Sequence, residues 1–176
     1  MLDIDGKSLL NEDKELILNK HVGGIIFFSR NFDSFEQISN LIKEIKELKE
    51  NILIAVDQEG GKVQRFNNEF TDIPSMQEIA KFAKKYDDSS ICKDIGWLIS
   101  SELVAAGIDI NFAPVLDLDE SMSNIIGNRA FSNNPDEVIY MASEYIDGMH
   151  EAGMRSTGKH FPGHGGVVQD SHLELP

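Results

Sequence analysis

The sequence is poor in cysteine, in basic residues and in long apolar runs, and each shortage excludes a class of protein. Its single cysteine, Cys92, cannot form an internal disulfide and leaves no Cys-rich zinc motif, so we expect a reducing compartment. Only 16 basic residues stand against 30 acidic ones, and the formal charge of −14 disfavours nucleic acid as a partner. No apolar run approaches the roughly 20 residues that span a bilayer. The N-terminus has no basic or apolar stretch typical of signal peptides, so we expect a cytoplasmic protein without a membrane partner.

Short apolar runs alternate with longer helical patterns along the chain. Residues 24–28, 52–56 and 110–116 have the composition of strands that are buried on both faces of a parallel sheet. Further short strands are expected at residues 1–4 and around residues 155–159. Periodic apolar residues predict helices at residues 35–49, at about residues 90–106 and from Pro135 to just before Gly153.

The predicted helices also indicate which side chains face the core. For residues 90–106 these are Ile91, Ile95, Leu98 and Val104. For the helix that starts at Pro135, Asn134 can cap the first turn. Its core face is expected to be Val138, Met141, Ala142, Tyr145 and Met149.

Alternating strands and helices form either an open doubly wound sheet or a closed (β/α)8 barrel. Polar residues follow the predicted strands, among them Asp57, Asp117 and Lys159. In a barrel these side chains converge on one rim, where such enzymes keep their active sites. No GxGxxG motif follows the first strand, which disfavours a dinucleotide-binding open sheet. We therefore expect an α/β fold of the TIM (β/α)8 barrel type, with about the first five β/α units in this chain.

The segment KHFPGHGGVVQDSH, residues 159–172, concentrates ionisable side chains in a loop rich in glycine. Asp170 and His172 are separated only by Ser171. A carboxylate in this position can hold the imidazole by a hydrogen bond, fix its tautomer and favour its charged form. Such a pair can serve as a general acid or base, although an isolated D-x-H pattern is more often a pair of solvated loop residues.

The same segment also allows a metal-binding interpretation. His160 and His164 have the spacing of a zinc-binding helix. However, Pro162 and the neighbouring glycines disfavour a helix, and there is no HExxH motif. A zinc-dependent hydrolase that uses His160, His164 and His172 is therefore the less favoured alternative.

Three further charged residues are candidates for ligand binding. Asp57 and Arg65 lie at the two ends of a Gly-rich loop, where a carboxylate and a guanidinium can bracket a sugar hydroxyl. The alternative is a structural ion pair that closes the loop. Arg129, in the segment IGNRAF, can likewise form a salt bridge at the rim. Asp117 is expected to be buried and to support other site residues.

Several ordered segments of the chain resemble glycoside hydrolase family 3, and within it the bacterial single-domain β-N-acetylglucosaminidases. They are GGIIFFSRN, VDQEGGKVQRF, NFAPVLDLD, IGNRAF, DGMHEAGMRSTGKHFPGHG and DSHLELP, and together they extend over essentially the whole chain. The resemblance implies a monomeric, cytoplasmic (β/α)8 barrel of peptidoglycan recycling. Such an enzyme removes N-acetylglucosamine from 1,6-anhydro-N-acetylmuramic acid and its peptide-bearing forms, without a metal or an organic cofactor.

The resemblance also implies a role for individual residues. His172 would be the acid/base catalyst, assisted by Asp170. The positions that hold the sugar would be Asp57, Arg65, Arg129, Lys159 and His160. The mechanism would be retaining, with a carboxylate that attacks the anomeric carbon while His172 protonates the leaving oxygen and later deprotonates water.

The nucleophile of this family is an aspartate downstream of the loop, so we expect it after residue 176. Residues 1–176 would then be the N-terminal part of one (β/α)8 catalytic domain and would have no catalytic power alone. The alternative from another class is a truncated, non-catalytic sugar-binding or interaction module.

Overall fold

The chain folds into strands that alternate with helices, as its sequence predicts. The computed structural model describes residues 1–120, 122–123, 125–170 and 172–173. The elements follow one another in the order α1 (Asn11–Leu18), β1 (Gly24–Phe27), the 3-10 helix η1 (Ser29–Asn31), α2 (Phe35–Leu48), β2 (Leu53–Val56), β3 (Gln58–Gly60), β4 (Val63–Gln64), α3 (Met76–Tyr86), α4 (Ser90–Ala106), β5 (Ile110–Asn111), the 3-10 helix η2 (Gly127–Arg129) and α5 (Pro135–Glu151).

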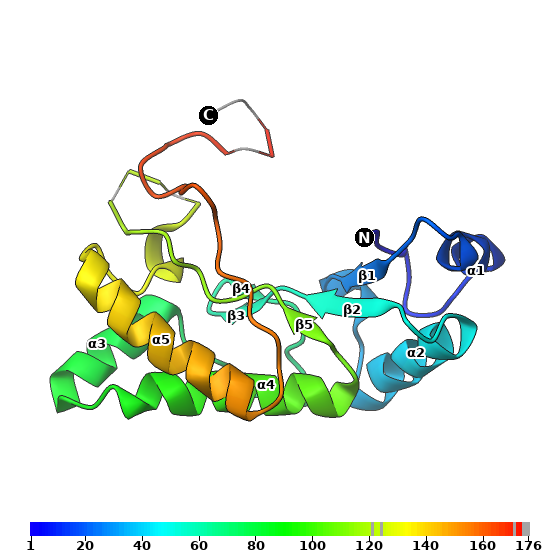
Figure 1. The fold of residues 1–176 in the computed structure, drawn as a ribbon, viewed down its shortest axis with the longest axis horizontal. Coiled ribbons are helices and arrows are strands. Elements are labelled where there is room, and N and C mark those ends of the chain that lie inside the picture. Colours follow the sequence, from blue (N-terminus) through cyan, green and yellow to red (C-terminus); the bar gives the residue numbers. More distant parts are fainter. Residues whose placement is uncertain (121, 124, 171, 174–176) are drawn as a thin grey trace.

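A parallel sheet in the order β1–β2–β5 lies at the centre of the fold (Figure 1). β1 and β2 pair along their full lengths. Leu2 bridges to β1 at one edge, and Arg155 bridges to β5 at the other. The strands expected at residues 1–4 and 155–159 are therefore isolated bridges rather than continuous strands, although both occupy the places in the sheet that a barrel requires.

β5 is shorter than its sequence predicts. It covers two residues instead of residues 110–116. One reason is that Pro114 has no N–H to donate to a strand ladder. The end of the segment instead hydrogen-bonds to the next edge of the sheet, where Leu116 N donates to Lys159 O at 2.7 Å. This bond fixes the backbone of Lys159 at the end of the sheet.

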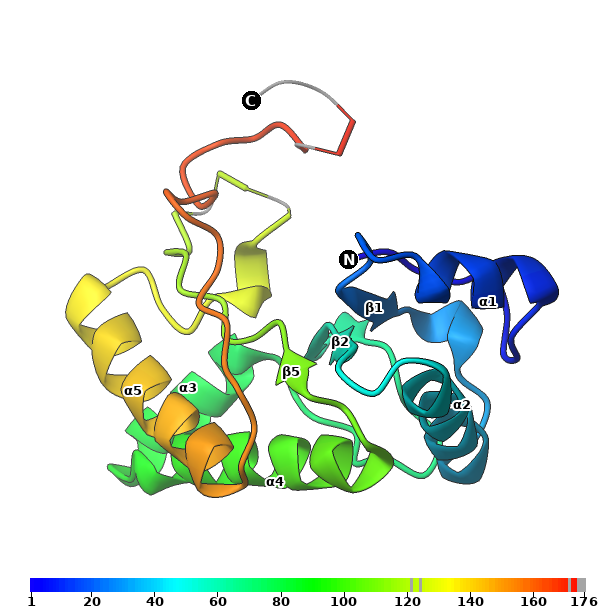
Figure 2. The same ribbon diagram turned by 45° about the vertical axis from the view of Figure 1, so that its right-hand side comes forward.

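The helices α2, α3, α4 and α5 lie on one side of the sheet. The described residues after Lys159, which we call the C-terminal segment, rise on the other side (Figures 1 and 2). α4 and α5 lie side by side, and their backbones touch. A Cβ atom on Gly96 would lie 2.2 Å from Tyr145 O, and one on Gly148 would lie 2.0 Å from Lys93 O. Cys92, on the same face of α4, is fully buried.

Periodicity locates three helices correctly and assigns one residue of α4 wrongly to the core. The helices expected at residues 35–49, at residues 90–106 and from Pro135 are observed as α2, α4 and α5. All the α5 residues expected to face the core are buried. In α4, however, Val104 is 42% exposed. The face that packs on α5 is set by Gly96, where the backbones can approach, rather than by the bulkiest side chains.

The sequence patterns did not indicate α1, α3 or the β3–β4 hairpin. α3 begins with a capping box in which Ser75 Oγ accepts from Glu78 N and the Glu78 carboxylate accepts from Ser75 N. The β3–β4 hairpin matters most for the site, because it directly follows β2. No described helix is both long and apolar enough to cross a membrane.

Candidate active site

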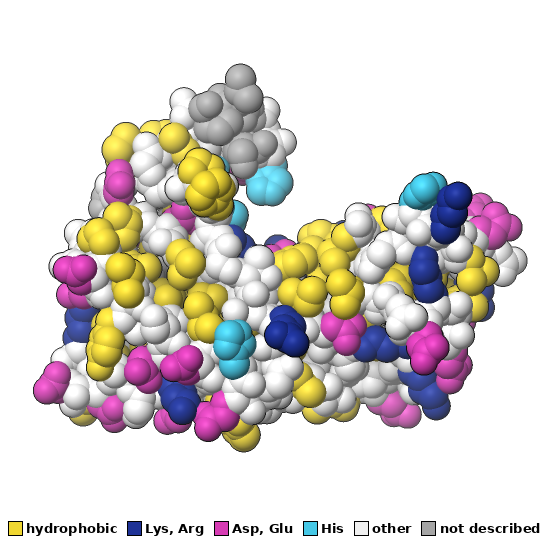
Figure 3. Space-filling view, viewed as in Figure 1, with side chains coloured by type: hydrophobic (Ala, Val, Ile, Leu, Met, Phe, Trp, Pro, Cys, Tyr) yellow, Lys and Arg dark blue, Asp and Glu magenta, His cyan; other side chains and the backbone are white. Residues whose placement is uncertain are grey.

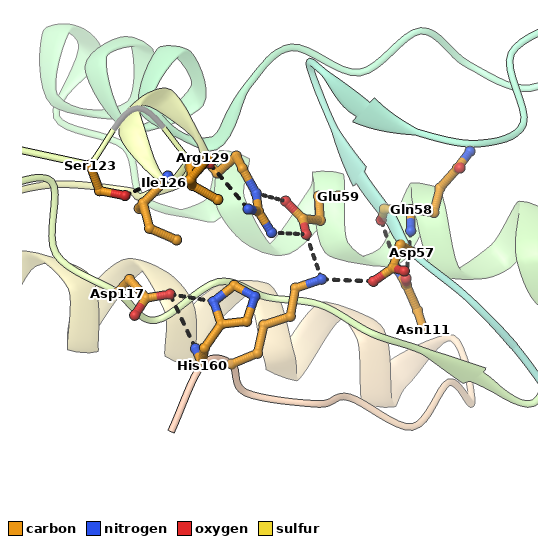
Figure 4. Close-up of polar contacts among 11 residues, drawn as sticks. Asp57, Gln58, Glu59, Asn111, Asp117, Ser123, Ile126, Arg129 and His160 are labelled. Atoms are coloured by element: carbon orange, nitrogen blue, oxygen red, sulfur yellow. Dashed lines mark hydrogen bonds and ion pairs between the residues drawn. The ribbon is translucent and has the colours of Figure 1, made fainter. Parts of the chain in front are cut away.

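Charged side chains from three distant parts of the chain meet at the ends of the strands (Figure 4). Asp57 follows β2, and Glu59 lies in β3. Arg129 ends η2, and Lys159 bridges to Val115 just beyond β5. We call these four residues the charged cluster. Their convergence is the arrangement expected for a barrel rim.

Glu59 connects the two cations of the charged cluster. Its two carboxylate oxygens accept from Arg129 Nε and Arg129 Nη2, each at 2.8 Å. Lys159 Nζ lies 2.5 Å from Glu59 Oε1 and 2.8 Å from Asp57 Oδ1. The side chains of Glu59 and Arg129 are only 3% and 11% exposed, so water screens this bidentate pair weakly.

The surroundings keep both members of this pair charged. Burial alone would raise the pKa of Glu59, but the hydrogen bonds of Arg129 and the charge of Lys159 outweigh it, and the pKa is lowered. Burial alone would lower the pKa of Arg129, but the hydrogen bonds and charge of Glu59 raise it above its ordinary value. The Glu59–Arg129 pair is therefore ionised near neutral pH.

Buried amides and a tight turn hold Glu59 in place. Asn111 Oδ1 accepts from Gln58 N at 3.0 Å, and Asn111 Nδ2 donates to Gln58 O at 2.8 Å. Gln58 Nε2 donates to Phe66 O at 2.8 Å across the hairpin. Gly60 then turns the chain at a φ of 99°, where a Cβ atom would lie 2.7 Å from Pro74 O.

Asp117 organises the start of the loop that follows Lys159 (Figure 4). Its Oδ2 atom lies 2.6 Å from His160 Nδ1 and accepts from His160 N at 3.1 Å, while Oδ1 accepts from His164 N at 2.5 Å. Burial would raise the pKa of Asp117, but these bonds outweigh it and lower the pKa. An ionised acceptor places the His160 proton on Nδ1 and leaves Nε2 for another contact. The expectation that Asp117 is buried is confirmed.

The ion pair between Asp57 and Arg65, the alternative to sugar binding, is not observed between these described residues. Asp57 pairs with Lys159, which reaches it from the edge of the sheet. Arg65 N donates to Gln58 Oε1, and the Arg65 guanidinium lies 5.8 Å from the centroid of the Phe28 ring. Arg65 Nε is buried and has no hydrogen-bond partner among the described residues. Arg65 thus lies beside the hairpin without closing it by an ion pair to Asp57.

Asp170 and His172 form the local pair that their spacing predicts. Asp170 Oδ1 accepts from His172 N at 2.9 Å and lies 2.7 Å from His172 Nδ1. These contacts lower the pKa of Asp170. The His172 side chain is 85% exposed. No hydrogen bond or ion pair between described residues links this pair to the charged cluster.

The C-terminal segment projects from the body of the molecule, and the surface is hollowed between it and the N-terminal part (Figure 3). A cavity of about 470 Å³ lies at the base of this segment and is lined in part by Asp117, Lys159 and His160. Both ring nitrogens of His164 are buried without partners among the described residues. Within the same described part of the chain, no three His, Cys, Asp or Glu side chains are grouped to hold a metal ion.

Sequence reasoning placed Glu59, the most buried member of the charged cluster, at a strand end but assigned it no role. Its signal was positional, because it lies directly between a buried strand and a Gly-Gly turn. It carries no motif of its own, and its two partners are distant in the sequence.

Comparisons with known proteins identify the family. Residues 1–176 match the family described as the glycosyl hydrolase family 3 N terminal domain. Beta-hexosaminidases of Idiomarina loihiensis and Haemophilus influenzae are 51% and 48% identical to the whole chain, which covers 53% and 50% of their lengths. The crystal structure of NagZ from Neisseria gonorrhoeae in complex with N-trifluoroacetyl-D-glucosamine is 45% identical, with a TM-score of 0.95, and is matched by 100% of this chain and 53% of its own.

The chain spans about half the length of the curated relatives it matches. The expected fold, an α/β structure of the TIM-barrel type, is confirmed by this structural match. The match over all residues, together with the strand-end site, shows that the chain belongs to glycosyl hydrolase family 3.

Proposed function

We propose that the protein that contains this chain is a retaining β-N-acetylhexosaminidase. It would release terminal β-linked N-acetylglucosamine from peptidoglycan fragments, namely GlcNAc-1,6-anhydroMurNAc and its peptides. The observation that carries the proposal is the charged cluster at the strand ends, in a chain about 50% identical to beta-hexosaminidases. The NagZ relative, in complex with a glucosamine derivative, supports a sugar of this class.

The charged cluster suits a ligand that carries hydroxyl groups. A hydroxyl both donates and accepts hydrogen bonds, so its site needs carboxylates as well as cationic donors. Asp57 supplies the acceptor, whereas Arg129 and Lys159 supply donors. We assign His160 to the same sugar-binding set because Asp117 fixes its ring. We assign Arg65 to it because this residue lies beside the hairpin that carries Glu59.

The Asp170–His172 pair suits proton transfer. Asp170 holds Nδ1 of the imidazole, so Nε2 can protonate the leaving oxygen and then take a proton from water. In a retaining mechanism a second carboxylate attacks the anomeric carbon, and we place this aspartate C-terminal to residue 176. Residues 1–176 would then supply the sugar site and the acid/base of one (β/α)8 catalytic domain.

The wider setting follows from the same proposal. The substrate would be a small carbohydrate or muropeptide, and the enzyme would act as a cytoplasmic monomer in peptidoglycan recycling, with no nucleic acid or membrane partner. The formal charge of −14 agrees with the absence of a polyanionic partner. Cell fractionation with an antibody to the full-length protein tests the location, and recovery in the membrane pellet would contradict it.

The decisive experiment uses the full-length protein and a chromogenic N-acetyl-β-glucosaminide. We expect turnover with retention of the anomeric configuration, its loss in His172→Ala and its preservation in His21→Ala, a control at an exposed histidine far from the site. Sugar binding without turnover by the wild type would favour the non-catalytic module instead. Inversion of configuration would contradict the retaining mechanism.

A further inference from the structure

Glu59 is the most buried member of the charged cluster and contacts both of its cations (Figure 4). One carboxylate oxygen contacts Arg129 and Lys159 together, and the other contacts Arg129. Both oxygens are therefore engaged by the protein. This use of its acceptors argues against direct sugar binding by Glu59 and for an effect exerted through its neighbours.

Each cation keeps donors for a ligand after its contacts with the protein are counted. A lysine ammonium has three N–H donors, and Lys159 uses two of them on Asp57 and Glu59. An arginine has five, and Arg129 uses two on Glu59 and one on Ile125 O. Glu59 thus fixes the direction of both side chains without using up their hydrogen-bonding capacity.

Glu59 also sets the charge of the charged cluster. Two carboxylates, those of Asp57 and Glu59, balance two cations, those of Arg129 and Lys159. Without Glu59 the remaining three groups would carry one net positive charge and would attract small anions. The balance suits an uncharged sugar unit better than a phosphate or sulfate ester.

We propose that Glu59 is a positioning residue that aims Arg129 and Lys159 at the sugar and keeps the charged cluster electrically neutral, so that the cluster discriminates against anionic substituents on the sugar unit that it holds. This inference rests on the proposed glycosidase function. It assigns Glu59 a role in substrate binding and selectivity rather than in bond cleavage.

The test uses the full-length protein as wild type, Glu59→Gln and Glu59→Asp, with the chromogenic N-acetyl-β-glucosaminide as substrate. Glu59→Gln keeps the shape but loses one charge. We expect its KM to rise at least about tenfold while kcat changes less than about threefold, because binding is weakened equally before and in the transition state. We also expect competitive inhibition by inorganic phosphate to become at least about fivefold stronger.

Glu59→Asp keeps the charge and shortens the reach, so we expect a raised KM and phosphate inhibition like that of the wild type. This variant also decides the matter if Glu59→Gln does not fold. The control is Glu102→Gln, because Glu102 is a structural carboxylate that accepts from Thr71 N and Thr71 Oγ1. It should alter Tm at most, with KM and phosphate inhibition unchanged.

An unchanged KM in Glu59→Gln and Glu59→Asp would overturn the positioning role. A lower apparent kcat with an unchanged KM would overturn it as well, because that pattern indicates only a smaller folded fraction. Phosphate inhibition that strengthens equally in Glu59→Asp would overturn the neutrality argument. Wild-type activity distinguishes all of these outcomes from failure of the proposed function, in which the wild type itself does not cleave the substrate.

Discussion

The charged cluster and the Asp170–His172 pair contrast in how they are held. Lys159 and Asp57 are 102 residues apart in sequence, and their side chains are 13% and 18% exposed. Asp170 and His172 are two residues apart, and the His172 side chain is 85% exposed. The geometry of the charged cluster therefore depends on the whole fold, whereas that of the pair depends on a few residues of one loop. We therefore expect substitutions in the charged cluster to lower the free energy of unfolding, and substitutions in the pair to lower the reaction rate.

The largest expected effect is on the reaction rate and comes from the exposed pair. In the full-length protein, His172→Ala should lower kcat by about 10²- to 10⁴-fold, because general acid–base catalysis is lost. The free energy of unfolding should change by less than about 0.5 kcal/mol, since the side chain is exposed. Steady-state kinetics and urea denaturation of the same samples check both parts. A large loss of stability would show that the loop is held by more than its local contacts.

The opposite pattern is expected from the charged cluster. Arg129→Ala leaves Glu59 buried with one of its two cationic partners missing, and should lower the free energy of unfolding by about 3 kcal/mol. Arg155→Ala, at an exposed arginine, is the control and should cost less than about 0.5 kcal/mol. Urea denaturation of the three proteins measures the difference. Equal stability of both variants would mean that water replaces the lost guanidinium.

A pair of adjacent glycines tests where the C-terminal segment joins the body. A Cβ atom on Gly165 would lie 2.1 Å from Leu118 O, whereas one on Gly166 would meet only the Glu120 carboxylate, at 3.1 Å. Gly165→Ala should therefore cost about 1–3 kcal/mol by overpacking, and Gly166→Ala clearly less. Thermal unfolding of both variants checks the order, which a similar Tm for the two would contradict.

The smallest effect is expected in acid. The pKa of Glu59 is lower in the folded protein than its ordinary value of 4.5, so the folded state binds fewer protons than the unfolded state. The contribution of the Glu59 carboxylate to the free energy of unfolding is complete above about pH 4.5. It disappears as the pH falls through the pKa of Glu59 in the folded protein. The pKa of Asp170 is also lowered, but solvent screens this exposed pair. Urea denaturation from pH 7 to pH 3 should thus show a flatter pH dependence for Glu59→Gln than for Asp170→Asn.

Local patterns in the sequence were sufficient to predict much of the fold. α2, α4 and α5 were expected because apolar periodicity and capping residues such as Asn134 depend on neighbours within a few positions. Asn134 does cap α5, where its side chain accepts from Asp136 N. In α4 the prediction was wrong at Val104, which is exposed, whereas its neighbour Leu103 is buried. The strand predicted at residues 110–116 was too long. Beyond β5 this segment no longer pairs with β2, and it contacts Lys159 instead.

In the site, too, contacts within one short segment could be predicted from the sequence, whereas contacts between distant segments could not. The contact of Asp170 with His172 was predictable because both residues lie in one short segment. The preference of Asp57 for Lys159 over Arg65 was not predictable, since Lys159 is near in space but distant in sequence. The role of Glu59 was not predicted for the same reason, because Arg129 and Lys159 are distant from it in sequence. The assignments of Asp57, Arg65, Arg129, Lys159, His160, Asp170 and His172 to sugar binding and proton transfer stay predictions.

The close approach of α4 and α5 gives the protein an intrinsic chemical reporter. Cys92 is the only thiol in the sequence, and it lies fully buried on the face of α4 that α5 covers. Burial, with a contribution from the charge of Glu144, raises the pKa of this thiol to about 11, so the reactive thiolate is scarce at neutral pH. Because a reagent reaches it only when the two helices separate, the rate of thiol labelling measures how often this layer of the fold opens.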